Sequence, residues 1–180
     1  MMMCRESFVT LILNLMDMSE KILAIDPGSQ ILGWALIHTD PLTYCNSGSL
    51  KIPKVDFYDR LGFILSFLEN LFAKENPSVL VLEKAFVGIN KEAALKLGQV
   101  RGAVMAFGQL HKLHFAEYAP RQAKKTVAGY GAASKEQVFS VCKMTLKNMP
   151  ETIDTFDQSD AVSIALCHHF MLKTHQVWSK

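Results

Sequence analysis

The sequence predicts an α/β domain in which one mixed five-stranded sheet is flanked by helices. Short apolar runs that end at a turn residue or a carboxylate are typical of buried strands, and longer segments with apolar residues every three or four positions are typical of helices. These segments follow one another in the order βββαβαβααα, which a single domain with helices packed on a mixed sheet accommodates. A chain of 180 residues, 49% hydrophobic and 20% charged, can also bury a substantial core.

The first three strands are predicted to form an antiparallel meander. Residues 22–25 are an apolar run that ends at Asp26 and a Pro-Gly turn, and residues 31–38 form a second strand almost immediately afterwards. The third strand, residues 44–52, follows a turn that contains Pro41. Connections this short join antiparallel neighbours, because a parallel crossover needs a much longer segment.

The rest of the chain alternates helices with two further strands. Residues 79–82 form the fourth strand, which ends at Glu83, and residues 114–118 form the fifth. Apolar residues at helical spacing fill the segments between and after them. The predicted helices cover residues 57 to about 76, 91–111, 120–127, 134–148 and 156–172.

Composition and motif spacing define the expected domain and its surroundings. We expect residues 1–18 to be an extension, either disordered or upstream of a true start at Met18, residues 19–175 to form the single domain, and residues 176–180 to be a tail. Four cysteines without a CxxC pair argue against a zinc site and a disulfide framework, and they fit a reducing cytoplasm. The longest apolar run, residues 8–16, is far shorter than the roughly 20 residues of a membrane span, so no membrane association is expected.

Basic residues gather in the second half of the chain. The net charge is only +2, but residues 84–147 hold eleven Lys and Arg against three Glu. Such a cluster is the electrostatic footprint of nucleic-acid binding, although a solvated face rich in lysine has the same composition. We therefore expect a surface that binds a polyanion.

Four carboxylates lie where metal chemistry is common. Asp26 and Glu83 each close a buried strand, and ligands of open α/β sheets bind beyond the carboxyl ends of the strands. Asp157 and Asp160 are three residues apart at the start of the last helix, so they share one face of it. Capping and turn formation are alternative explanations for each residue alone, but four converging carboxylates destabilise a fold unless a cation neutralises them. An oxygen-only set favours Mg²⁺, which can activate water and stabilise a leaving oxygen at phosphorus.

Five segments of the chain together resemble one known family. The segments are 25–29 (IDPGS), 83–86 (EKAF), 94–102 (ALKLGQVRG), 118–122 (YAPRQ) and 157–161 (DQSDA). In this order and with compatible spacing, they resemble the RuvC family of bacterial Holliday junction resolvases over about residues 21–169. The resemblance implies an RNase H-like fold, a homodimer and Mg²⁺-dependent, symmetrical nicking of two opposing strands of four-way DNA junctions in recombination and repair. It also implies a branch-migration helicase complex of the RuvA and RuvB type as a partner.

The resemblance assigns the catalytic set. Asp26, Glu83, Asp157 and Asp160 match the family's catalytic carboxylates, which would hold one or two Mg²⁺ ions, or Mn²⁺ in their place. Lys84 departs from the family, in which Gln is frequent after the catalytic glutamate. This departure concerns contacts with the junction rather than the reaction.

The resemblance also assigns residues that contact DNA. Phe86 matches an aromatic side chain at the junction-opening position, although it could instead fold back on the sheet. Lys124 and Lys135 match functional lysines, and Arg121 is assigned to the same DNA-binding set.

Three other functions fit parts of the pattern. Actin-like ATPases and sugar kinases also begin with a strand, an Asp and a Gly-containing hairpin, but they need a second, duplicated half for which 180 residues leave no room. An RNase H-like nuclease that processes ribosomal RNA precursors is a nearer alternative, although such proteins lack the segment 94–102. A non-catalytic junction-binding module would not need all four acids.

The helix over residues 91–111 has two faces to bury. One face is a stripe of small residues that includes Gly98 and Gly102, and each glycine in a helix costs about 1 kcal/mol relative to alanine. Close approach of another backbone would offset this cost, so we expect a two-fold dimer of about 40 kDa, twice the 20.1 kDa chain. The sequence does not decide which face meets the partner. The small residues are Ala94, Gly98, Gly102 and Ala106, and the opposite face carries Leu97, Val100, Val104 and Phe107.

Several other conspicuous residues are interpreted as structural. His168 and His169 lie more than two helical turns beyond Asp160, which is too far for them to join a metal site there. The remaining residues interpreted as packing are Trp34, Met105, Cys142 and Cys167.

Overall fold

The computed structural model describes residues 20–84 and 90–178, with side chains to residue 174. The predicted extension, residues 1–18, and Phe86 lie outside the described residues. The elements follow the predicted order, and α6 continues beyond the predicted end at residue 172. They are β1 (Lys21–Asp26), β2 (Ile31–Thr39), β3 (Leu42–Lys51), α2 (Phe57–Glu75), β4 (Val79–Glu83), α3 (Lys91–Leu110), β5 (His114–Tyr118), α4 (Pro120–Ala128), α5 (Lys135–Thr145) and α6 (Phe156–Trp178).

The strands form one mixed sheet with the order β3-β2-β1-β4-β5. β1, β2 and β3 pair antiparallel, as the short connections predict, whereas β4 and β5 run parallel to β1. The predicted mixed five-stranded sheet is therefore confirmed. β3 starts at Leu42, two residues earlier than predicted, because pairing of Leu42 with Thr39 extends the hairpin almost to the turn.

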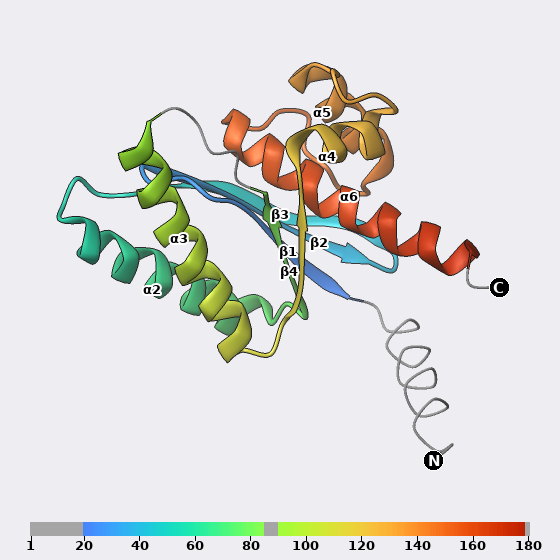
Figure 1. Ribbon diagram of the computed structural model, residues 1–180. Coiled ribbons are helices and arrows are strands. Elements are labelled where there is room, and N and C mark those ends of the chain that lie inside the picture. Colours follow the sequence, from blue (N-terminus) through green and yellow to red (C-terminus); the bar gives the residue numbers. More distant parts are fainter. Residues whose placement is uncertain (1–19, 85–89, 179–180) are drawn as a thin grey trace, which may run out of the picture.

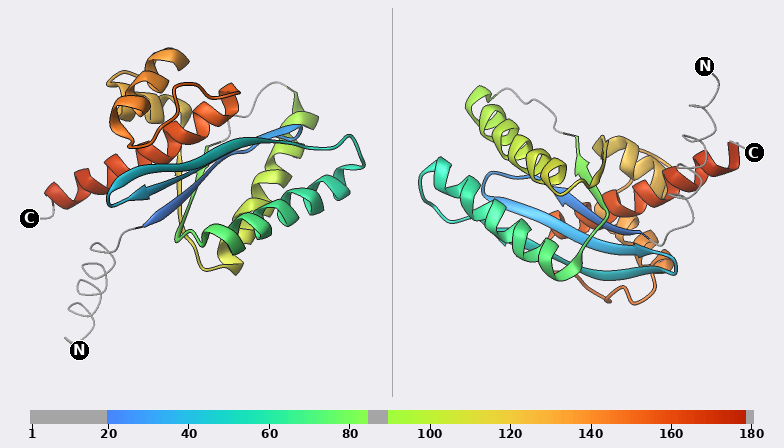
Figure 2. Two further views of the ribbon diagram at one scale, coloured as in Figure 1. Left: turned by 180° about the vertical axis from the view of Figure 1, so that it is seen from behind. Right: turned by 90° about the horizontal axis from the view of Figure 1, so that it is seen from below.

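Alternation along the strands creates a separate core on each face of the sheet. Ile22 and Ala24 of β1 contribute to one core with α4, α5 and α6, whereas Leu23 and Ile25 contribute to the other with α2 and α3. Figures 1 and 2 show these two helical layers with the sheet between them. β1, β2 and β4 are therefore apolar on both faces, which explains the continuous apolar runs in the sequence.

Helix α6 lies across the sheet and is buried along most of its length. His168, His169 and Cys167 of this helix are buried, and so is Cys142 of α5. Their burial confirms the interpretation of these four residues as structural. The hydroxyl of Tyr118 lies 2.9 Å from Nδ1 of His168, and burial lowers the pKa of His168 to about 4. A neutral histidine here supports packing between β5 and α6.

Helix α3 buries only its apolar face. Val104 and Phe107 pack against the sheet, whereas a Cβ atom added at Gly98 or Gly102 would meet nothing within 4 Å. The interpretation of Met105 as a packing residue is wrong, because 41% of its surface is exposed on the outer side of this helix. None of the described helices is both long and apolar enough to cross a membrane.

Trp34 is half-buried and packs against α2, which confirms the packing role predicted for it. Its ring centroid lies 5.8 Å from that of Phe67 on α2, with the two planes inclined by 58°. On the neighbouring strand, a Cβ atom at Gly48 would lie 2.9 Å from Nε1 of Trp34. A glycine at this position therefore leaves room for the indole ring.

Candidate active site

Asp26 and Glu83 are brought side by side by the pairing of β1 with β4. These strands are parallel, and Ile25 pairs with Leu82, so the next residue of each strand lies at the same edge of the sheet. Alternation directs both carboxylates to the face covered by α6, because Ala24 and Val81, two residues earlier, belong to that core. The strand ends place two acids together exactly where the sheet meets the last helix.

Gly33 allows the third carboxylate to approach. It pairs with Asp26 across β1 and β2, and a Cβ atom there would lie 2.3 Å from the carbonyl oxygen of Asp157 and 3.0 Å from its Cβ atom. The first turn of α6 therefore rests directly on the backbone of β2. Sequence reasoning missed this role, although a glycine inside an apolar strand is a signal of close approach by another backbone.

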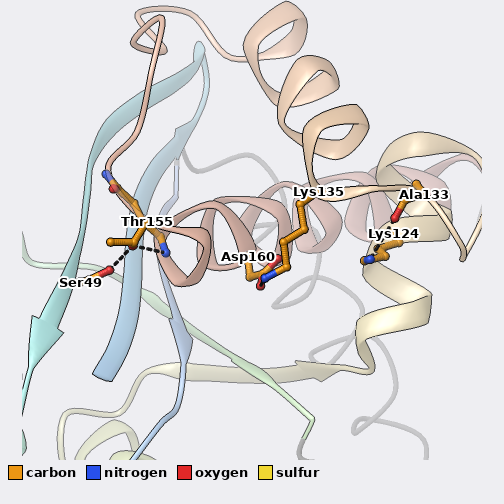
Figure 3. A network of polar contacts seen from close by, with 7 residues as sticks. Ser49, Lys124, Ala133, Lys135, Thr155 and Asp160 are labelled. Atoms are coloured by element: carbon orange, nitrogen blue, oxygen red, sulfur yellow. Dashed lines mark hydrogen bonds and ion pairs between the residues drawn. The ribbon is translucent and has the colours of Figure 1, made fainter. Parts of the chain in front are cut away.

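Side chains from β3 fix the start of α6. Nε2 of Gln158 donates to Oγ of Ser47 at 2.7 Å, and Oε1 of Gln158 accepts from the backbone N–H of Asp154 at 3.0 Å. The hydroxyls of Ser49 and Thr155 are also in contact, as Figure 3 shows. These bonds hold the segment that carries Asp157 against the sheet.

Asp26 and Glu83 have raised pKa values at this site. Burial, the charge of Glu83, a hydrogen bond with Glu83 and the charges of Asp160 and Asp157 raise the pKa of Asp26 to about 8. Burial also raises the pKa of Glu83. The hydrogen bond with Asp26 and the positive charges of Lys135 and Arg101 oppose part of this effect. The site therefore holds more negative charge than it can retain without a proton or a cation.

Lys135 supplies one compensating charge from α5. Ser134 caps this helix by accepting from the backbone N–H of Gln137, which places Lys135 in the first turn. Its Nζ atom lies 2.7 Å from Oδ2 of Asp160. Figure 3 shows the two side chains next to each other. Burial alone would lower the pKa of Lys135, but this hydrogen bond and the charges of Asp160, Asp157 and Asp26 raise it. The ammonium therefore interacts electrostatically with all four carboxylates.

Arg101 of α3 supports Glu83 from the opposite face of the sheet. Its guanidinium donates to the backbone carbonyl of Glu83, and Nη2 lies 2.6 Å from Oε2 of Glu117 on β5. The planar fork thus connects the ends of β4 and β5, a geometry that lysine cannot reproduce. Sequence reasoning counted Arg101 only as part of the basic cluster, because its partners become visible only when the sheet is formed.

The residues assigned to DNA binding lie on α4, α5 and the segment outside the described residues. Nζ of Lys124 donates to the carbonyl of Ala133 at 2.9 Å and so connects α4 to the start of α5 (Figure 3). Arg121 is exposed in the first turn of α4, directly after β5 ends. Phe86 lies outside the described residues.

The four carboxylates have the chemistry of a site for a hard divalent cation. They offer only oxygen ligands, they are partly buried, and the raised pKa values of Asp26 and Glu83 show uncompensated charge. Within residues 20–84 and 90–174, no three His, Cys, Asp or Glu side chains are already arranged around a common point as metal ligands. Asp160 directs Oδ2 to Lys135. The chemistry of this donor set nevertheless fits such a cation.

Comparison with known families gives this geometry its context. The family model described as "Crossover junction endodeoxyribonuclease RuvC" matches residues 22–168, which include all four carboxylates. The chain belongs to the RuvC family. RuvC of Chloroherpeton thalassium is 42% identical over 151 residues, which cover 82% of this chain and 81% of that protein. RuvC of Rickettsia felis is 39% identical over 153 residues, which cover 83% of this chain and 97% of that protein.

Solved structures agree with the assignment to the RuvC family. The structure described as "T. thermophilus RuvC in complex with Holliday junction substrate" has a TM-score of 0.79 and 26% sequence identity, and it covers 87% of this chain and 96% of that chain. A yeast mitochondrial Holliday junction resolvase has a TM-score of 0.70 and 15% identity over 94% of this chain and 89% of its own, which supports the fold alone. The family is a nuclease family that depends on divalent metal ions.

Proposed function

We propose that this protein resolves four-way DNA junctions by metal-dependent hydrolysis of phosphodiester bonds. It nicks two opposing strands symmetrically, and it acts in recombination and DNA repair. The observation that carries this proposal is the carboxylate cluster at the carboxyl ends of β1 and β4, in a chain of the RuvC family. An acidic site next to basic helices combines what a nuclease needs for chemistry and for holding the phosphate backbone.

The catalytic groups are Asp26, Glu83, Asp157 and Asp160. They would hold Mg²⁺, or Mn²⁺ in its place, as one or two ions. When bound, the metal supplies an activated water and stabilises the leaving oxygen in an in-line displacement at phosphorus. In the metal-free protein the raised pKa of Asp26 keeps a proton in the cluster, and the carboxylates must lose it to act as ligands.

Arg101 and Lys135 have different roles in this mechanism. Arg101 is a positioning residue, because it donates a hydrogen bond to the backbone carbonyl of Glu83 from the face of the sheet that α6 does not cover. Lys135 neutralises Asp160 in the free protein and lies where a phosphate group would approach the carboxylates. If a divalent cation neutralised Asp160 in its place, this ammonium would pair with a phosphate of the DNA backbone.

DNA binding is assigned to Phe86, Arg121, Lys124 and Lys135. The exposed position of Arg121 and the location of Lys135 beside the carboxylates support phosphate contacts. Lys124 also donates to a backbone carbonyl, so its replacement is expected to loosen the connection between α4 and α5 as well as weaken DNA binding. Phe86 is assigned to wedging or stacking at the junction centre.

A homodimer would place one active site on each of two opposing strands. The stripe on α3 supports this arrangement, because Gly98 and Gly102 leave open space above the helix. Apolar residues flank the stripe, with exposed fractions of 65% for Leu95, 41% for Met105 and 79% for Leu110. A second copy of this chain would cover them.

The cellular context follows from the same proposal. We infer a cytoplasmic protein that works with a branch-migration helicase complex of the RuvA and RuvB type. The support for this inference is membership of the RuvC family.

The experiment that tests the proposed activity compares three substrates at equal concentration in Mg²⁺. They are a synthetic four-way junction, a linear duplex containing one arm of it, and a single-stranded RNA. The proposal predicts paired nicks in the junction and little cleavage of the other two. Preferential cleavage of the RNA would instead favour an RNA-processing nuclease, and binding without cleavage in either Mg²⁺ or Mn²⁺ would favour a non-catalytic module.

A further inference from the structure

A cavity beside the carboxylates has no part in the mechanism described above. It has a volume of about 280 Å³ and lies between the first turns of α5 and the segment that leads into α6. Lys135 and Phe139 line it from α5, and Asp154 and Phe156 line it from the other side. Since Lys135 also contacts Asp160, the cavity and the carboxylate cluster share a wall.

Phe156 is the unusual feature of this cavity. It precedes the catalytic Asp157 directly, yet 61% of its surface is exposed. The Nζ atom of Lys135 lies 4.9 Å from the centre of its ring and 2.7 Å from Oδ2 of Asp160. An exposed aromatic face and a carboxylate of the proposed catalytic set therefore share one ammonium.

The composition of the cavity selects against a phosphate group. Asp154 and Glu136 place carboxylates around it, and its single lysine lies at the wall shared with Asp160 rather than inside the cavity. The apolar surface of Phe139, Ile153 and Phe156 favours a flat, uncharged ring. The volume lies near the lower limit of small-molecule sites, which fits one ring system better than a larger ligand.

We propose that this cavity receives one nucleobase of the cleaved DNA strand, next to the scissile phosphate. The base stacks on Phe156, and Asp154 accepts a hydrogen bond from an exocyclic amino group, such as that of cytosine or adenine. The cavity thereby contributes to the base preference of cleavage. This inference rests on the proposed junction-cleaving activity, because only that activity brings a DNA strand to Asp160.

The first test measures base preference at the nick. Junctions that differ only in the bases flanking the cleaved phosphate are cut under single-turnover conditions by the wild type, Phe156→Ala, Phe156→Trp and Asp154→Ala. A hydrogen bond to a base edge changes the preference by roughly 5- to 150-fold, and stacking holds the base in place for that contact. We expect Asp154→Ala, which removes the acceptor, and Phe156→Ala, which removes the stacking surface, to reduce the preference by an amount in this range and Phe156→Trp to retain it.

A matched control removes an exposed aromatic side chain elsewhere. Phe115 is 45% exposed near the start of β5, at the end of the sheet opposite to the carboxylates. Phe115→Ala should leave the base preference unchanged. This control separates loss of the proposed stacking surface from a general effect of removing an aromatic ring.

The second test does not depend on cleavage, because Phe156→Ala could also displace Asp157. Junctions carrying 5-iododeoxycytidine beside the cleavage site are irradiated with the protein in EDTA, and the adducts are located by mass spectrometry. We expect an adduct at Phe156 in the wild type and its loss in Phe156→Ala. If no adduct maps to this cavity, or if both Phe156→Ala and Asp154→Ala keep the wild-type preference, the inference is wrong while junction cleavage still stands. If the wild type neither binds nor cuts junctions, the proposed function and this inference fail together.

Discussion

Replacing Asp26 by asparagine is expected to raise the free energy of unfolding of the metal-free protein. Burial and the neighbouring carboxylates raise the pKa of Asp26 from its ordinary value of 3.8 to about 8, so the folded chain holds a proton that the unfolded chain releases. Between these two values, stability is therefore lost as the pH rises, and the full penalty is present above pH 8. Asparagine keeps the shape of the side chain but removes the charge that causes the penalty.

The pKa values set the size of this effect. Each pKa unit corresponds to about 1.4 kcal/mol, so a rise from 3.8 to about 8 gives a ceiling of about 6 kcal/mol. Asp26 shares its interactions with Glu83, and residual solvent screens part of the charge, so we expect about 1–3 kcal/mol to be recovered. In a chain of this length, that corresponds to an increase in melting temperature of about 2–12 °C.

Thermal unfolding in EDTA, followed by circular dichroism from pH 5 to pH 9, measures this gain. The difference in melting temperature between Asp26→Asn and the wild type should grow as the pH rises. Addition of Mg²⁺ should stabilise the wild type more than the variant. Asp59→Asn is the control, because Asp59 is exposed in the first turn of α2, where its loss should slightly destabilise the helix. Equal melting temperatures for the wild type and Asp26→Asn at pH 8 would refute the electrostatic reasoning.

Three further predictions concern the backbone, the dimer and the DNA contacts. Gly33→Ala places a methyl group against the start of α6, so it should lower the free energy of unfolding by about 1–3 kcal/mol in chemical denaturation and should slow cleavage. The control Gly62→Ala places a methyl group where no neighbour lies within 4 Å, so it should be neutral or slightly stabilising. Gly98→Leu should convert the proposed dimer to a monomer in light scattering and abolish paired nicking without lowering subunit stability. A monomeric wild type at micromolar concentration would contradict the dimer proposal. Lys135→Ala should reduce the slope of log K for junction binding against log salt by about one. The control Lys74→Ala changes a side chain that is 75% exposed at the far end of α2, so it should leave the slope unchanged. Equal slopes in both variants would remove Lys135 from the phosphate contacts.

Local features were sufficient to predict the sheet and to single out the four acids that we propose as catalytic. Asp26 and Glu83 stand out because each ends an apolar run, and alternation then directs both to one face. Asp157 and Asp160 stand out because a three-residue spacing places them on one side of a helix. These inferences need only the periods of strands and helices.

Contacts between distant segments could not be predicted in the same way. The apposition of Gly33 and Asp157 depends on how α6 crosses β2, and the contact between Lys135 and Phe156 depends on how α5 packs beside α6. Met105 shows the limit of periodicity, because an apolar residue on a helix with two apolar faces does not reveal which face the sheet covers. Packing between elements decides each of these cases.

Cleavage of a synthetic four-way junction with each strand labelled in turn tests the central claim most directly. In Mg²⁺ the wild type should nick two opposing strands at symmetrical positions. Variants with a neutral amide at a catalytic acid should bind the junction in EDTA but cut it at least about 100-fold more slowly in Mg²⁺. A wild type that cuts no junction in Mg²⁺ or Mn²⁺, or a variant that cuts at the wild-type rate, would contradict the account. The variants are Asp26→Asn, Glu83→Gln, Asp157→Asn and Asp160→Asn.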